Sequence, residues 1–128
     1  MTEGRKLTEN DICKAAKKAS KHAYAPYSGF PVGAAVETDV GICTGCNVEN
    51  ASYGLTVCAE RNAIFKAVSK GAKKVSRVAV YNQKKIPIPC GACLQVLSEF
   101  AAGNCEIFVV TDRRKNKMML KDLLPRPF

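Results

Sequence analysis

Two short stretches decide the fold and the chemistry of this chain: Cys58-Ala59-Glu60 and, further along, Pro89-Cys90-Gly91-Ala92-Cys93. Each lies at the start of a segment whose apolar residues recur at helical spacing. A Cys-x-x-Cys pair at a helix start lets both sulfurs face one ion, and a third sulfur leaves one position of a tetrahedral zinc open for water. The pattern predicts an open zinc site formed by Cys58, Cys90 and Cys93.

The residues after Cys58 fit the needs of such a site. Glu60 lies within reach of water on the metal without being a ligand, and a carboxylate there is suited to move protons. Three thiolates on a divalent ion leave a net charge of about −1, so the site needs positive potential. Two helix N-termini and Arg61 supply it. We therefore predict Glu60 as the catalytic residue and Arg61 as the compensating charge.

Helical and strand patterns alternate along the rest of the chain, and Thr8 with Asp11 is typical of a capping box. The expected helices cover about 8–24, 58–70 and 89–100, with Pro89 in the first helical turn, and the expected strands cover 30–38, 42–48, 77–81 and 107–111. Residues 117–124 are expected to form an edge strand and a short helical turn. We predict one domain over residues 1–128, a three-layer α-β-α sandwich whose mixed sheet has about five strands, with 77–81 and 107–111 parallel.

Composition places the chain among ordinary globular proteins, with 47% hydrophobic and 24% charged residues in 128. No apolar run approaches the roughly 20 residues that cross a bilayer, and Met1–Lys6 lacks the apolar stretch of a signal peptide. The chain has seven cysteines, and because this number is odd, they cannot all be paired in disulfides within the chain. We expect a soluble, cytoplasmic protein in which at least some of the cysteines serve metal binding or catalysis, without a membrane partner.

The net charge of +9, from 20 Lys and Arg against 11 Asp and Glu, raises the alternative of nucleic-acid binding. No RNA-binding or helix-turn-helix signature accompanies the charge, and aromatic residues are few. We therefore favour a solubility role for the basic residues, with a basic nucleic-acid-binding module as the less favoured alternative.

Four further stretches carry a family resemblance together with the zinc motifs: Tyr24–Ser28, Phe30–Ala35, Gly45–Ala51 and Leu123–Pro125. Over nearly its whole length the chain resembles the small homotetrameric cytidine deaminases, with Cys58 in the slot that holds histidine in other zinc deaminases. The resemblance implies a cytidine deaminase-like fold and one Zn2+ per subunit. It also implies hydrolytic deamination of cytidine and 2'-deoxycytidine to uridine and 2'-deoxyuridine, with release of ammonia, in pyrimidine salvage.

The resemblance also assigns roles to residues of this sequence. Zinc-bound hydroxide would attack carbon 4 of the base while Glu60 moves protons. The implied contacts to the nucleoside are Asn47 and Glu49 to the ribose hydroxyls, Phe30 stacking near the base, the backbone at Ala59 to the base carbonyl, and Tyr53 and Phe128 reaching into a neighbouring subunit's site. These residues also have plainer interpretations, as loop and surface residues, core aromatics or interface packing.

Two departures from the family pattern bear on the site. Leu94 stands where the family commonly has arginine after the second cysteine of the pair, and Ile88 stands where serine commonly precedes the proline. A related motif occurs in deaminases of the antibiotic blasticidin S, so a deaminase of that type remains an alternative. A polynucleotide deaminase is a less favoured alternative, suggested by the net positive charge. The ribose pair of Asn47 and Glu49 favours the nucleoside.

The remaining cysteines are interpreted as structural. Cys43 and Cys46 also form a Cys-x-x-Cys, but on a strand an odd separation points the two side chains to opposite faces. We predict structural roles for both, and for Cys13 and Cys105. His22 is predicted to lie on the surface near the end of the first helix, without a ligand role.

Overall fold

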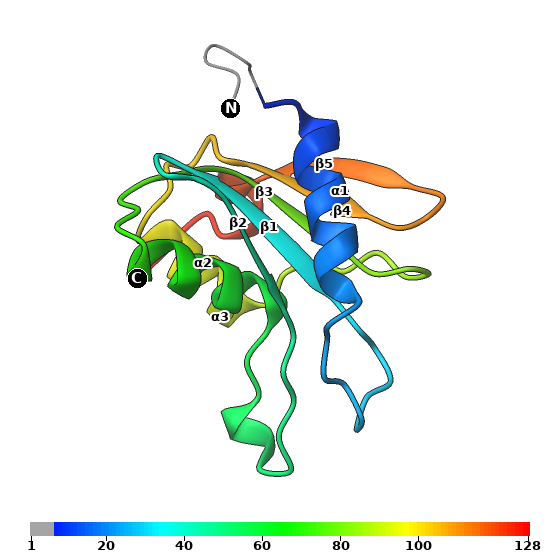
Figure 1. Ribbon diagram of the computed structural model, residues 1–128. Helices are drawn as coiled ribbons and strands as arrows, with labels where there is room; N and C mark the ends of the chain where they lie inside the picture. The colour runs from blue at the N-terminus through cyan, green and yellow to red at the C-terminus, as the bar shows by residue number, and fades with distance from the viewer. Residues whose placement is uncertain (1–6) are drawn as a thin grey trace.

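A five-stranded mixed sheet lies between helices in the computed structural model, which describes residues 7–128 (Figure 1). Residues 1–6, which carried the expectation of no signal peptide, lie outside the described residues. The elements are α1 (Glu9–Ser20), β1 (Gly33–Thr38), β2 (Gly41–Cys46), the 3-10 helix η1 (Tyr53–Leu55), α2 (Ala59–Ser69), β3 (Val75–Tyr81), α3 (Gly91–Ser98), β4 (Glu106–Val110), β5 (Lys115–Met119) and α4 (Leu120–Leu123).

The strand order is β2-β1-β3-β4-β5, and β3 and β4 form the parallel pair while the other neighbours are antiparallel. A parallel pair needs a crossover connection, and the segment containing α3 provides it. The predicted α/β class, the mixed sheet and the parallel relation of the third and fourth strands are confirmed. None of the helices within residues 7–128 has the length and apolar character needed to cross a membrane.

Several predicted boundaries of helices and strands were wrong. The first helix ends at Ser20 rather than Tyr24, because the backbone of Tyr24 bonds instead to Asn47 and Glu49. The first strand begins at Gly33 rather than Phe30. The third helix begins at Gly91, so Pro89 lies before its N-cap and not in its first turn. For the first helix and the first strand, long-range hydrogen bonds to residues 47 and 49 decide where the regular element ends or begins.

Two separate cores cover the two faces of the sheet. Ile12 and Ala16 of α1 pack with Phe108 on one face, and Ala63 and Ile64 of α2 belong to the larger cluster on the other. Figure 1 shows α1 on one side and α2 with α3 on the opposite side. The helices with the cysteine motifs therefore share one face of the sheet.

Glycines allow the helices to approach the sheet closely. A Cβ at Gly33 would lie 2.0 Å from the carbonyl oxygen of Ala16 in α1. A Cβ at Gly45 would lie 2.5 Å from the backbone nitrogen of Ala63 in α2. No side chain fits at such distances, so glycine in β1 and β2 sets the depth at which both helices pack.

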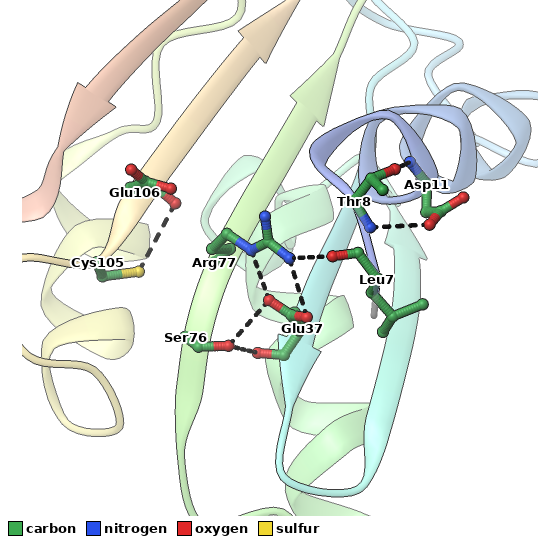
Figure 2. A network of polar contacts seen from close by, with 8 residues as sticks. All are labelled: Leu7, Thr8, Asp11, Glu37, Ser76, Arg77, Cys105 and Glu106. Carbon is green, nitrogen blue, oxygen red and sulfur yellow. Dashed lines mark hydrogen bonds and ion pairs between the residues drawn. The ribbon is translucent and has the colours of Figure 1, made fainter. Parts of the chain in front are cut away.

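A charged pair joins the sheet to the start of α1 (Figure 2). Arg77 Nε and Nη2 donate to the two carboxylate oxygens of Glu37 at 2.6 and 3.1 Å, and Nη2 also donates to the carbonyl oxygen of Leu7 at 2.7 Å. The hydrogen bond from Arg77 holds the pKa of Glu37 below its ordinary value. The predicted capping box follows at once, with Thr8 and Asp11 bonded reciprocally.

Candidate active site

Three cysteine sulfurs from two helix beginnings come together on one face of the sheet. Cys58 is the N-cap of α2, Cys90 is the N-cap of α3, and Cys93 lies in the first turn of α3. The Sγ atoms of Cys58 and Cys90 are 3.9 Å apart, those of Cys90 and Cys93 are 3.4 Å apart, and all three lie within 4.8 Å of one another. A tetrahedral zinc with bonds of about 2.3 Å separates its sulfur ligands by about 3.8 Å. The donor set therefore fits a zinc ion.

The cluster is electrostatically prepared for a cation. Arg61 Nη2 lies 3.4 Å from the sulfur of Cys58. The hydrogen bond from Cys93, together with that from Arg61, lowers the pKa of Cys58 to about 5, while the same pairing and burial raise the pKa of Cys93. A thiolate is thus already favoured at Cys58, and a bound metal would displace the remaining thiol protons.

Glu60 lies in the first turn of α2, with only 7% of its surface exposed. Burial, reinforced by the charge of Cys58, raises the pKa of this carboxyl to about 7. Both Glu60 and Cys58 line the same cavity. The predicted proton-transfer group is therefore a buried carboxyl beside the sulfur cluster and open to whatever the cavity holds.

The cavity has a volume of ≈ 380 Å³, which suits a small organic molecule. Its lining residues are Tyr27, Ser28, Phe30, Val32, Asn47, Glu49, Tyr53, Thr56, Cys58, Ala59, Glu60, Val80, Pro87, Ile88 and Cys90. Every predicted nucleoside-contacting residue is in this set except Phe128. The structure therefore brings the sequence-predicted site together in one place, with that one exception.

Asn47 holds the aromatic side of the cavity. Its Oδ1 accepts from the backbone nitrogen of Val32 at 2.9 Å, and its Nδ2 donates to the carbonyl oxygen of Phe30 at 2.9 Å. These two bonds replace the strand pairing that the sequence predicted for residues 30–32. The side chain retains a second Nδ2 hydrogen for a ligand.

Glu49 is bound by the turn that precedes Phe30. Its Oε1 accepts from the backbone nitrogens of Tyr27 at 2.9 Å and Ser28 at 3.0 Å, and its Oε2 accepts from the Ser28 hydroxyl. The hydrogen bond from the Ser28 hydroxyl is the main reason that the pKa of Glu49 lies below its ordinary value. Glu49 is therefore an ionised acceptor that faces the cavity, with lone pairs left for hydroxyl donors.

Tyr53 and Phe128 lie at the exposed margins of the molecule. Tyr53 belongs to η1 on the arm 47–57, which projects beyond the sheet in Figure 1, and 84% of its surface is exposed. Phe128 is fully exposed, and its backbone nitrogen donates to Gln95 Oε1 at 2.9 Å. Their predicted contact with a neighbouring subunit stays a prediction.

The two departures from the family pattern have different surroundings. Leu94 is 5% exposed and belongs to the core cluster under α3, so it adds no charge to the metal site. Ile88 is half exposed and lines the cavity, where it makes the rim more apolar than a serine would.

The other cysteines lie outside the sulfur cluster. Cys43 is buried in the core, whereas Cys46 is half buried, and the metal-ligand group found within residues 7–128 contains neither. Burial raises the pKa of Cys105 to about 12 and also raises the pKa of Cys13. The predicted structural interpretation agrees with these surroundings, and His22 is exposed as expected.

Sequence reasoning did not assign a substrate-side role to Ser28 or Pro87, yet both line the cavity. Ser28 lies in the quoted stretch Tyr24–Ser28, so a signal was present there. Pro87 lies in a loop between a strand and a helix, where neither periodicity nor spacing indicates its position. Only the packing of that loop beside the cysteines brings it to the cavity wall.

Three cysteine sulfurs whose spacing fits a zinc ion, with a buried carboxyl beside them in an α/β fold, are the arrangement of a metal-dependent hydrolase. Comparison with known proteins narrows this class. The family described as "Cytidine and deoxycytidylate deaminase zinc-binding region" matches residues 7–109. The chain belongs to this family.

Individual relatives agree with the family match. The chain is 50% identical to a cytidine deaminase of Sporosarcina psychrophila over 95 residues, covering 73% of this chain and 70% of that one. It is 42% identical to a cytidine deaminase of Halalkalibacterium halodurans over 120 residues, covering 91% of both. The crystal structure of cytidine deaminase from Burkholderia pseudomallei superposes with a TM-score of 0.89 at 42% identity, covering 95% of this chain and all of that one. These names do not favour the blasticidin S alternative.

Proposed function

We propose that this chain catalyses the zinc-dependent hydrolytic deamination of cytidine and 2'-deoxycytidine to uridine and 2'-deoxyuridine, releasing ammonia. The observation that carries the proposal is that Glu60 and two of the three clustered cysteines, Cys58 and Cys90, line the same cavity as Phe30, Asn47 and Glu49. The relatives named above are cytidine deaminases, which supports the same substrate.

Cys58, Cys90 and Cys93 would hold the ion. When bound, zinc supplies a Lewis acid that lowers the pKa of water enough to yield a nucleophile near neutral pH. Arg61 and the two helix N-termini offset the negative charge of the sulfurs. The protein thereby keeps three anionic ligands close together in a half-buried site.

Glu60 moves the protons of the reaction. Its carboxylate takes a proton from the attacking water, delivers it to the ring nitrogen next to carbon 4, and then passes the second proton to the departing amino group. Water adds its oxygen to carbon 4, the carbon–nitrogen bond breaks, and ammonia leaves. The burial of Glu60 beside Cys58 keeps this carboxyl in the cavity and away from bulk water.

Other residues that line the cavity would bind the nucleoside. Phe30 offers an aromatic face to the base, while the backbone at Ala59 meets the base carbonyl. Asn47 and Glu49 offer a donor and an acceptor to the sugar hydroxyls. A phosphate beside the ionised Glu49 would be repelled, so we propose preference for the nucleoside over its monophosphate.

We further propose that the enzyme is a homotetramer with shared active sites, serving pyrimidine salvage in the cytoplasm. Exposed apolar side chains on the projecting arm support assembly: Val48 is 45%, Tyr53 is 84% and Leu55 is 67% exposed. In a tetramer Tyr53 and Phe128 would reach a neighbouring cavity. Light scattering that finds only monomers in an active preparation would contradict this proposal.

The test follows the ultraviolet absorbance of cytidine and 2'-deoxycytidine with the zinc-loaded protein, and measures ammonia release and zinc content in parallel. Loss of the cytidine spectrum with one ammonia per turnover supports the proposal, and comparable turnover of cytidine monophosphate would refute the nucleoside preference. Zinc without turnover of cytidine would refute the substrate, and blasticidin S would be assayed next. Salt-dependent binding of single-stranded nucleic acid would revive the polynucleotide alternative.

A further inference from the structure

We propose that Asn82 is a positioning residue that sets the distance between the two walls of the cavity. Its side-chain amide joins the segment carrying Phe30 to the loop that leads to the zinc ligand Cys90. Asn82 itself does not line the cavity. The inference rests on the proposed function, because the cavity it shapes is the proposed nucleoside site.

The side chain of Asn82 is almost completely used in hydrogen bonds. It follows the last residue of β3 and is only 4% exposed. Its Nδ2 donates to the carbonyl oxygen of Pro31 at 2.8 Å. Its Oδ1 accepts from the backbone nitrogens of Lys84 at 3.0 Å and Lys85 at 2.9 Å. One buried amide therefore holds two segments that are distant in sequence.

Each segment forms a wall of the cavity. Pro31 lies between Phe30 and Val32, and both of these line the cavity. On the other side, the turn held at Lys84 and Lys85 continues into Pro87, Ile88 and Cys90, which also line it. The backbone of Asn82 is fixed in the sheet, since its nitrogen donates to the carbonyl oxygen of Val110 at 3.1 Å. Both walls of the cavity are therefore held by hydrogen bonds to one residue at the end of β3.

The neighbouring parallel strand shows which of these bonds the turn itself requires. Tyr81 pairs with Val110, so Asn82 and Thr111 occupy equivalent positions after β3 and β4. Thr111 Oγ1 accepts from the backbone nitrogens of Arg113 at 3.2 Å and Arg114 at 3.0 Å. A hydroxyl is therefore sufficient to hold a turn of this kind in this protein.

The difference between the two positions lies in the amide group. Threonine has no group that extends as the Nδ2 of asparagine does, so it could hold the turn at Lys84 and Lys85 but would not span the distance to Pro31. The hydrogen bond from Asn82 Nδ2 to Pro31 is therefore not required to hold the turn at Lys84 and Lys85. We assign to that bond the separation of the Phe30 wall from the Cys90 wall.

Two variants separate the two arms of this link. Asn82→Thr is expected to keep the turn and lose the bond to Pro31, whereas Asn82→Ala loses both. Thr111→Ala is the matched control, because it removes the equivalent turn bonds on β4 at a position that does not line the cavity. The readouts are KM and kcat for cytidine, the Kd of the product uridine, zinc retention against a chelator, and Tm.

The expected result for Asn82→Thr is a rise in KM and in the uridine Kd of roughly tenfold, with kcat within about twofold and zinc retention unchanged, because ground-state and transition-state binding weaken together. Asn82→Ala adds faster zinc loss, since the loop before Cys90 loosens. Thr111→Ala lowers Tm without changing KM or zinc retention.

A wild-type KM and uridine Kd in Asn82→Thr would overturn the proposal, as would an equal change in Thr111→Ala. If Asn82→Thr does not fold, Asn82→Ser provides the same hydroxyl with less bulk, and the same outcomes apply. Failure of the wild type with cytidine would refute the proposed function separately. In that case zinc retention alone tests whether Asn82 holds the loop that leads to Cys90. Equal zinc retention in Asn82→Ala and Thr111→Ala would overturn the proposal.

Discussion

The guanidinium of Arg61 lies 3.4 Å from the sulfur of Cys58, three residues before it on the same helix. This spacing places the charge of Arg61 beside a proposed zinc ligand, and the pairing raises the pKa of Arg61 above its ordinary value. Within residues 7–128, the buried Nε of Arg61 has no hydrogen-bond partner. Leu94 carries no charge, so in the part of the chain that the structure describes, the side-chain cation that we find bonded to the sulfur cluster is Arg61.

Replacing Arg61 with alanine is therefore expected to weaken zinc retention by at least about tenfold, since the anionic sulfurs lose their compensating charge. The measurement is the rate of zinc transfer to a colorimetric chelator. Lys66→Ala removes a cation from the last turn of the same helix and serves as the control. Zinc content and release rate unchanged in Arg61→Ala would remove the charge-compensation hypothesis.

Replacing Glu60 with glutamine preserves the shape of the side chain and removes the group that we propose for proton transfer. We expect kcat for cytidine to fall by roughly 10²- to 10⁴-fold, while zinc content stays at the wild-type level, because Glu60 is not a ligand. The exposed Glu99, at the end of α3, gives the control variant Glu99→Gln. Near-normal turnover in Glu60→Gln would show that another group transfers the protons.

Gly45 in β2 controls the depth of the helix that carries Cys58, Glu60 and Arg61. A Cβ there would meet the backbone of Ala63 at 2.5 Å, so Gly45→Ala must displace α2. We expect the free energy of unfolding to drop by about 2 kcal/mol or more, together with weaker zinc retention. Gly54→Ala, where the new Cβ meets nothing within 4 Å, is the control. Denaturant titration of the two variants at fixed zinc concentration distinguishes them, and equal stabilities would contradict the packing argument.

The pair of Glu37 and Arg77 predicts a pH dependence of stability. The pKa of Glu37 is lowered from its ordinary value of 4.5, so the stabilisation is present above about pH 4.5 and is lost as the pH falls through the lower folded-state pKa. At pH 7 we expect Glu37→Gln to be less stable than the wild type by about 1 to 3 kcal/mol. The difference should shrink towards zero at acidic pH.

The measurement for this prediction is the difference in unfolding free energy between the two proteins at matched zinc from pH 7 down to pH 4. Loss of zinc in acid affects both proteins and largely cancels in the difference. A gap that stays constant or widens as the pH falls would contradict the assignment of the stabilisation to the ionised Glu37.

Local patterns predicted much of this molecule. The Cys-x-x-Cys spacing and the position of Glu60 two residues after Cys58 are relations within one helix turn, which sequence expresses directly. The capping box of Thr8 and Asp11 is equally local, and the structure contains it. The prediction failed where a long-range bond ended a regular element, as when the backbone of Tyr24 paired with residues 47 and 49.

The sequence by itself indicated the three cysteines that could hold a metal ion, the carboxyl proposed for proton transfer, and the alternation of helices and strands, because spacing and periodicity are short-range properties of the chain. Only the tertiary structure decided that Asn47 and Glu49 hold residues 27–32 through side-chain bonds to the backbone. It also decided that Asn82 joins Pro31 to the turn at Lys84 and Lys85, which leads to Cys90. Such bonds depend on how distant segments pack across the sheet. The physical reason is that a buried amide or carboxyl takes whichever partners the fold brings within reach, and no local pattern specifies those partners.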